Sequence, residues 1–153
     1  MKHKCHYKTP IGTIFIEEKD NYITALYIDD KESDTEDIET ELIRRTYTQL
    51  CEYFEGQRRE FDIPINPQGT EFQQKVWAAL RTIPYGETRS YGEIAEQIGN
   101  PKACRAVGGA NNKNPILIIT PCHRVIGADG SLVGFGAGLD VKKVLIELER
   151  QQV

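Results

Sequence analysis

A cysteine stands directly before a histidine in residues 121–125, and this pair has the residue types of a nucleophile and its base. A thiol with an ordinary pKa of about 8.5 is only a few per cent ionised near neutral pH. A nucleophilic Cys122 therefore needs a base or a positive charge beside it, and His123 and Arg124 are candidates. The same pair is also compatible with a small buried thiol that has no chemical role. The surrounding elements must decide between the two.

The elements on either side of this pair predict how it is held. Residues 116–119 are apolar and rich in β-branched side chains, which predicts a short buried extended segment. Pro121 ends that segment because it lacks a backbone donor and disfavours the helical region for Thr120. A last helix is predicted over residues 139–150, and Glu149 lies close to its apolar face. A carboxylate at that place is either a solvated terminal residue or the partner of a buried group. The apolar residues expected to pack from this helix are Leu139, Val141, Val144, Leu145 and Leu148.

Three further helices are predicted over residues 71–82, 91–98 and 101–111. Thr70 and Ser90 each precede a glutamine or glutamate by three residues, which is the pattern of a capping box. Asn100 followed by proline predicts the N-cap of the third helix. The side chains expected to be buried by the first helix are Phe72, Val76, Ala79 and Leu80, with Trp77 adjoining. The last two helices are separated by a short turn, which fits a helix-turn-helix or an ordinary helical hairpin.

Small residues dominate one end of the third helix, and Arg105 is the long side chain in its middle. A helix of this composition can approach another surface closely, or it can pack tightly against a second helix. The glycine-rich residues 134–138 can bring backbone amides to a planar ligand, or they can form a flexible connection. The composition leaves both pairs of alternatives open.

The first part of the chain predicts strands at residues 7–16 and 22–28, a helix over 37–54 and an extended piece at 61–65. Proline and glycine in residues 66–69 predict a boundary. We therefore expect domains at 1–66 and 67–153. The clustered His3, Cys5 and His6 can ligate a metal ion, but a mobile basic terminus is the preferred interpretation.

The charge is divided unevenly between these two parts. The 153 residues carry a net charge of −4, residues 1–66 carry 9 Lys and Arg against 15 Asp and Glu, and residues 67–153 carry 10 against 8. The second part is therefore mildly basic and able to face phosphates. No apolar run is long enough to cross a bilayer and no signal-peptide core follows the charged start, so a cytoplasmic protein is expected. The four cysteines lack the paired short spacing of a disulfide framework or a zinc site.

Residues 85–91, 100–110 and 121–125 together resemble the O6-alkylguanine-DNA alkyltransferases, the methylated-DNA–protein-cysteine methyltransferases. The resemblance covers residues 67–150 with the family's order and spacing. It implies an α+β protein in which a small ribonuclease-like α/β domain precedes a mostly helical, winged-helix-like domain with a helix-turn-helix. Residues 1–66 fit the first of these domains only loosely.

The resemblance implies direct reversal of DNA damage. An alkyl group on guanine O6, and less readily on thymine O4, passes irreversibly to Cys122, so that each molecule acts once. The implied partner is double-stranded DNA with alkylated bases, the protein is expected to be a monomer, and no cofactor or metal is needed. The implied catalytic residues are Cys122, His123, Glu149 and Tyr91; the DNA contacts are Arg105, Tyr91, Gly92, Asn100 and Ala128; and the pocket residues are Asn114, Val125, Phe135, Gly136 and Lys142.

In the resemblance, His123 takes the thiol proton through a water molecule, Glu149 orients the imidazole, and Arg105 fills the space left by the extruded base. Asn114 matches a hinge asparagine, whereas Lys142 fits either a pocket-supporting lysine or a solvated helix lysine. Many members have tyrosine where Phe135 stands and a second glycine where Ala137 stands, so the preference for alkyl size is open. The zinc ligands of some N-terminal domains are not recognisable.

Two other functions remain as hypotheses. A helix-turn-helix protein can bind a lesion as a sensor or regulator without any chemistry. A cysteine hydrolase can use Cys122 and His123, although adjacent side chains on an extended backbone point apart, which disfavours direct contact between them.

Overall fold

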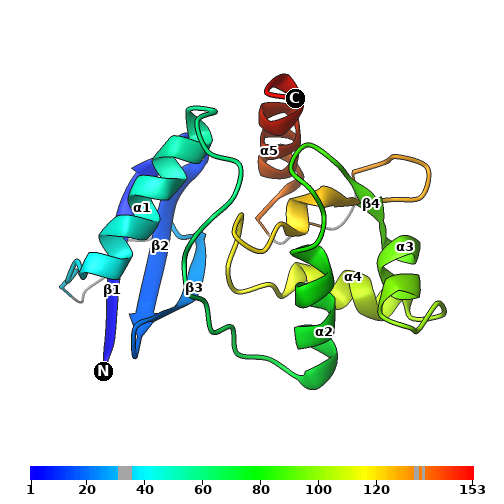
Figure 1. The fold of residues 1–153 in the computed structure, drawn as a ribbon, viewed down its shortest axis with the longest axis horizontal. Helices are drawn as coiled ribbons and strands as arrows, with labels where there is room; N and C mark the ends of the chain where they lie inside the picture. Colours follow the sequence, from blue (N-terminus) through cyan, green and yellow to red (C-terminus); the bar gives the residue numbers. More distant parts are fainter. Residues whose placement is uncertain (31–35, 133–134, 136) are drawn as a thin grey trace. The chain divides into compact units, whose positions relative to one another are not determined.

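The structure is a computed structural model that describes residues 1–30, 36–132, 135 and 137–153. The chain forms two compact units, Met1–Gln68 and Gly69–Val153, each with its own secondary structure (Figure 1). Within the described ranges, no helix has the length and apolar character needed to span a membrane.

An antiparallel sheet of three strands, in the order β1–β2–β3, forms the base of the first unit. The strands are β1 (Lys2–Thr9), β2 (Gly12–Lys19) and β3 (Tyr22–Ile28). Asp20 and Asn21 both have positive φ, 53° and 68°, as a two-residue hairpin turn requires. The strand predicted at 22–28 is confirmed. The single strand predicted at 7–16 is wrong, because a turn between Thr9 and Gly12 divides that run between β1 and β2.

The basic N-terminal residues form an edge strand of this sheet, so the prediction of a mobile terminus is wrong. Residues Lys2 to Thr9 all pair with β2, and Cys5 is buried. Asp37 adds a further link, because it accepts from the His6 amide at 2.9 Å and from Lys4 Nζ at 2.5 Å. The alternation of side chains along a strand buries Cys5 while its charged neighbours face these partners.

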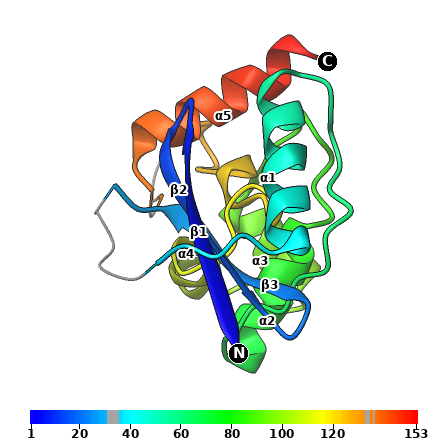
Figure 2. The same ribbon diagram turned by 90° about the vertical axis from the view of Figure 1, so that its left-hand side faces the viewer.

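The helix of the first unit, α1 (Glu41–Phe54), packs against the three strands (Figure 2). It begins later than predicted because Thr40 is the N-cap and accepts from the Ile43 amide at 3.1 Å. Residues 37–39 instead follow the sheet edge, where the Ile38 amide donates to the Lys4 carbonyl at 3.0 Å. The extended piece at 61–65 reaches the sheet through a parallel bridge between Ile65 and Ile23.

The second unit is mostly helical. It contains α2 (Glu71–Leu80), α3 (Tyr91–Gln97), α4 (Cys104–Asn112) and α5 (Leu139–Gln151). Two very short parallel strands, β4 (Arg89–Ser90) and β5 (Val125–Ile126), lie beside each other, and a 3₁₀ turn, η1 (Cys122–Arg124), directly precedes β5. Helices α2, α3 and α4 pack on one another. Trp77 of α2 is buried, with 1% of its surface exposed, and its Nε1 donates a hydrogen bond to the Ala110 carbonyl of α4 at 2.9 Å.

The capping boxes predicted at Thr70 and Ser90 are confirmed, and each has both reciprocal hydrogen bonds. The predicted N-cap at Asn100 is wrong. Its amide donates to the Ala95 carbonyl at 2.9 Å after Gly99, which has a φ of +80°, so Asn100 completes the C-terminal motif of α3. Helix α4 begins three residues later than the predicted start at 101, after Ala103, which makes no side-chain cap.

The segment before the cysteine is buried as predicted, but its extended conformation is wrong. Ile118 has a φ of +68°, and the Ile119 amide donates to the Leu117 carbonyl at 2.7 Å, which makes a tight turn. A positive φ is unfavourable for a β-branched residue, so contacts elsewhere must hold this turn. The side chain of Asn114 supplies two of them, to the Thr120 carbonyl and the Ile116 amide.

Candidate functional site

Cys122 begins η1 immediately after Pro121, and its amide donates to the Thr120 carbonyl at 2.8 Å. Its side chain is 2% exposed, and burial raises the pKa of the thiol to about 11. A hydrogen bond from Asn114 and the positive charge of Lys142 act in the opposite direction. The resting sulfur is therefore a protonated thiol at neutral pH, and it needs a base to become a nucleophile.

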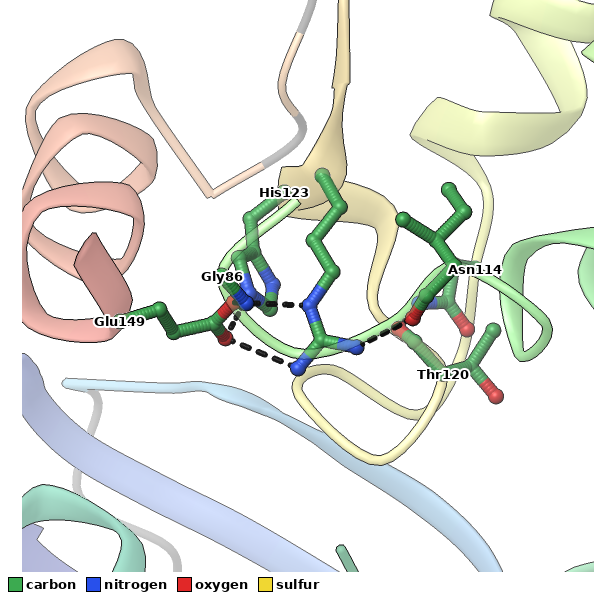
Figure 3. Close-up of polar contacts among 7 residues, drawn as sticks. Gly86, Asn114, Thr120, His123 and Glu149 are labelled. Atoms are coloured by element: carbon green, nitrogen blue, oxygen red, sulfur yellow. Dashed lines mark hydrogen bonds and ion pairs between the residues drawn. The ribbon is translucent and has the colours of Figure 1, made fainter. Parts of the chain in front are cut away.

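His123 is fully buried and directed at Glu149. Its Nε2 lies 2.6 Å from Oε2 of Glu149, a contact that requires the proton of a neutral ring to sit on Nε2 (Figure 3). Burial holds the pKa of His123 below its ordinary value, so the ring is neutral near pH 7. The other ring nitrogen, Nδ1, is buried and has no hydrogen-bond partner among the described residues. Nδ1 is therefore available to accept a proton.

Glu149 is the centre of a buried hydrogen-bond network (Figure 3). Oε1 accepts from Nε of Arg124 at 2.8 Å and from the Gly86 amide at 3.1 Å, and Oε2 accepts from Nη2 of Arg124 at 3.0 Å. Arg124 also donates from Nη1 to the Ile83 carbonyl at 2.7 Å. Burial opposes ionisation of Glu149, but the hydrogen bonds and charges of His123 and Arg124 outweigh it and hold its pKa well below the ordinary value. Glu149 is thus a carboxylate.

The buried face of α5 explains how this carboxylate reaches the site. The face consists of Lys142, Leu145, Ile146 and Glu149. The predicted packing set is wrong at Leu139 and Val144, which are 48% and 49% exposed. Lys142 and Glu149 lie on the inner face instead, and hydrogen bonds satisfy the carboxylate of Glu149 there. The prediction that Glu149 lies near the apolar face is confirmed.

Asn114 fastens both ends of the turn that precedes Cys122. Its Nδ2 donates to the Thr120 carbonyl at 2.8 Å, and its Oδ1 accepts from the Ile116 amide at 3.0 Å. Because a buried side chain bonds the backbone on either side of Ile118, the unfavourable φ of that residue is enforced locally. The turn then delivers Cys122 at a defined place.

Lys142 is a buried cation between two aromatic rings. It is fully buried, and its Nζ lies 5.7 Å from the ring centroid of Tyr91 and 5.8 Å from that of Phe135. Burial lowers its pKa to about 8 and raises that of Tyr91, whose hydroxyl therefore stays protonated. The alternative of a solvated lysine is wrong. Val125 is buried in β5, whereas Gly136 lies outside the described residues.

The structure places the five residues expected to contact DNA on two helices and two turns. Tyr91 and Gly92 are the first residues of α3, and Arg105 is an exposed residue in the first turn of α4. Asn100 is exposed between these helices, and Ala128 is exposed in the turn closed by the hydrogen bond from Gly130 to Gly127.

Two members of the Glu149 network and one buried polar residue were not predicted from the sequence. Arg124 was considered only as a helper of Cys122, yet it is the ion-pair partner of Glu149. Gly86 contributes a backbone amide, which no side-chain pattern reveals. Asn111 is 1% exposed on α4, where the composition predicted only close packing or close approach to another surface. In the parts of the chain that the structure describes, no group of three His, Cys, Asp or Glu side chains is arranged to hold a metal ion.

Each of the two units matches a known protein-family model. Residues 71–151 match the family model of the 6-O-methylguanine DNA methyltransferase DNA binding domain, and residues 3–67 match that of its ribonuclease-like domain. The methylated-DNA–protein-cysteine methyltransferase of Mycobacterium leprae is 50% identical over 157 residues, covering 100% of this chain and 95% of the relative.

Solved structures of similar proteins align with the whole chain or nearly all of it. The crystal structure of Mycobacterium tuberculosis O6-methylguanine methyltransferase aligns with a TM-score of 0.91 at 46% identity, covering 100% of this chain and 95% of the other. The Mycobacterium tuberculosis protein in complex with DNA aligns with a TM-score of 0.90 at 48% identity, covering 99% and 94%. With both units matched and the whole chain aligned at such identity, this protein belongs to the 6-O-methylguanine DNA methyltransferase family.

Proposed function

We propose that this protein repairs alkylated double-stranded DNA by moving the alkyl group from guanine O6, and less readily from thymine O4, irreversibly to Cys122. Each molecule acts once, because a thioether is a stable product. The observation that carries this proposal is the buried pair of His123 and Glu149 beside the thiol, with Nδ1 of His123 unpartnered among the described residues. Such a pair supplies a base to a thiol that burial keeps protonated.

The transfer begins when the proton of Cys122 passes through a water molecule to Nδ1 of His123. Glu149 stabilises the imidazolium that forms, as the carboxylate does in other nucleophile–histidine–carboxylate arrangements. The thiolate then attacks the alkyl carbon in line, so that an S–C bond forms while the bond from carbon to O6 breaks. Guanine leaves with the electron pair, and the Tyr91 hydroxyl gives a proton to ring N3 to neutralise it. The imidazolium restores the proton of Tyr91 through solvent.

The base is held by groups around the thiol. The carbonyl oxygens of Cys122 and Val125 accept from the exocyclic amine, and the backbone amide of Phe135 approaches O6. Lys142 supports this pocket with a positive charge that favours the thiolate. Asn114 fixes the turn that presents Cys122.

Chemistry at O6 requires the nucleotide to leave the base stack, at a cost of about a few kcal/mol that damage reduces. Arg105 enters the vacated space from α4, whose small residues allow close approach to the minor groove. Contacts from Tyr91, Gly92, Asn100 and Ala128 hold the DNA backbone. All five occupy exposed or half-exposed positions, which supports this assignment.

The two domains have different roles in this proposal. We assign residues 67–153 to DNA binding and alkyl acceptance and residues 1–66 to a separate α/β domain. In this proposal the protein is cytoplasmic and acts as a monomer. One chain supplies the hydrogen bonds of His123 and Arg124 to Glu149 and of Asn114 to Thr120, which supports a monomer.

The decisive experiment measures protein mass after incubation with a duplex oligonucleotide that contains O6-methylguanine. We expect one added methyl group on the peptide that bears Cys122. Cys122→Ala abolishes the transfer, whereas Cys104→Ala, which removes an exposed thiol, does not. Binding of the lesion with no change in protein mass contradicts the proposal and identifies a sensor without chemistry. Repeated turnover contradicts it as well.

A further inference from the structure

Asn111 is a buried side chain that nothing in the described structure satisfies. It is 1% exposed, and neither Nδ2 nor Oδ1 has a hydrogen-bond partner among the described residues. Leaving a buried carboxamide without partners lowers stability, so native proteins retain such groups when a ligand or an ordered water molecule satisfies them. The burial of Asn111 therefore calls for a partner that arrives from outside the described chain.

The position of Asn111 on α4 indicates which partner. Gly108 lies one turn before it, and a Cβ added there would lie 3.9 Å from the ring of Tyr91. Asn114 lies three residues after it, and its side-chain Nδ2 donates to the carbonyl of Thr120, two residues before Cys122, at 2.8 Å. The Asn114 backbone amide also donates to the Asn111 carbonyl at 3.4 Å, which continues the helical turn. Gly108 and Asn111 are three residues apart and share a face of α4, and Asn114 follows just after the end of that helix. Asn111 therefore lies in the sequence between the position that meets Tyr91 and the residue that holds the turn before Cys122.

We propose that the carboxamide of Asn111 hydrogen-bonds the nucleobase that enters between Tyr91 and Cys122, and that Asn111 thereby helps to select the base. This inference rests on the proposed function. A carboxamide offers one donor group and one acceptor, which matches the mixed donors and acceptors along the edge of a nucleobase. Burial does not exclude the contact, because Cys122 is itself only 2% exposed and must meet the same substrate.

Asn111→Leu tests this inference because leucine has a similar size and no polar atoms. Asn112→Leu is the matched control, since Asn112 is its exposed neighbour on the same helix. Three quantities are measured for each protein: the rate of methyl transfer from the O6-methylguanine duplex, the rate at which iodoacetamide labels the Cys122 peptide, and the melting temperature.

For Asn111→Leu we expect methyl transfer to slow by about tenfold or more, as the loss of a hydrogen bond to substrate predicts. The rate of iodoacetamide labelling stays within about twofold of that of the unaltered protein. The melting temperature rises because the substitution removes a buried amide that lacks hydrogen-bond partners. The control changes none of the three. A merely structural asparagine predicts the opposite pattern, with a lower melting temperature.

Unchanged methyl transfer in Asn111→Leu overturns the inference, and so does a parallel fall in methyl transfer and melting temperature, which identifies an asparagine bonded to an internal water molecule. Failure of the proposed function is distinguishable from both, because in that case the unaltered protein gains no methyl group on Cys122.

Discussion

Replacement of Arg124 by methionine removes the cation that shares Glu149 with His123. Arg124 is 7% exposed and Glu149 1% exposed, and two hydrogen bonds of 2.8 and 3.0 Å join them. Loss of one partner from such a buried pair costs about 3–5 kcal/mol, because the remaining charge is uncompensated. For a chain of this size, each kcal/mol lowers the melting temperature by roughly 2–4 °C. We therefore expect a fall of roughly 6–20 °C.

Replacement of Arg124 by methionine also changes the pKa of His123, the proposed general base. The charge of Arg124 lowers the pKa of His123, although burial lowers it more, and the charge of Glu149 raises it. Without Arg124, the carboxylate acts on His123 alone, so the pKa of His123 rises and the ring is protonated over more of the neutral range. A protonated ring accepts no proton from Cys122. The rate of methyl transfer should therefore fall near pH 7 and recover as the pH is raised.

Calorimetry and single-turnover rates between pH 5 and 9 check both expectations. Arg124→Lys is the matched control, because it keeps the charge but loses the paired geometry, and its pH profile should move less. The double variant Arg124→Met with Glu149→Gln should lose less stability than the sum of the single variants, since no unpaired carboxylate remains. A pH profile that does not move in Arg124→Met would refute the reasoning, whatever happens to the melting temperature.

Three further outcomes are expected. Lys142→Met removes the charge that lowers the pKa of Cys122, so iodoacetamide labelling of this thiol at pH 8 should slow; a faster reaction would show that the cation does not favour the thiolate. Ser90→Ala removes the N-cap of α3 and should cost about 1 kcal/mol in chemical denaturation, and a loss below a few tenths of that would contradict the role of the cap. Glu149 has a depressed pKa, so its stabilisation is present above about pH 4.5 and lost as the pH falls. The stability advantage over Glu149→Gln should therefore shrink in acid, and a constant difference down to pH 3 would count against an ionised Glu149.

Predictions that depend on local chemistry were the reliable ones. The capping boxes at Thr70 and Ser90 each require only residues within one helical turn, and both are present. The helix after residue 138 and the place of Glu149 near its apolar face follow from periodicity alone, and the structure has both. These features need no knowledge of distant parts of the chain.

Predictions that ignored longer contacts failed. Asparagine before proline is typical of an N-cap. The backbone amide of Asn100 instead donates to the Ala95 carbonyl, so the residue belongs to the C-terminal end of α3. The β-branched residues 116–119 favour extended backbone, but the side chain of Asn114 bonds both ends of the segment and enforces a turn at Ile118. In each case a hydrogen bond to another element outweighed a local preference.

The sequence by itself determined that this chain holds a cysteine and a histidine side by side, the helices near them, and the motifs of its family. Those properties reside in residue types and short spacings. Only the tertiary structure decided that His123 and Arg124 both bind the carboxylate of Glu149 on α5, and that the Gly86 amide donates to the same carboxylate. It also decided that Asn111 is buried without a hydrogen-bond partner among the described residues. The reason is physical: the pKa of a buried group and the satisfaction of its hydrogen bonds depend on neighbours that folding brings from distant parts of the sequence.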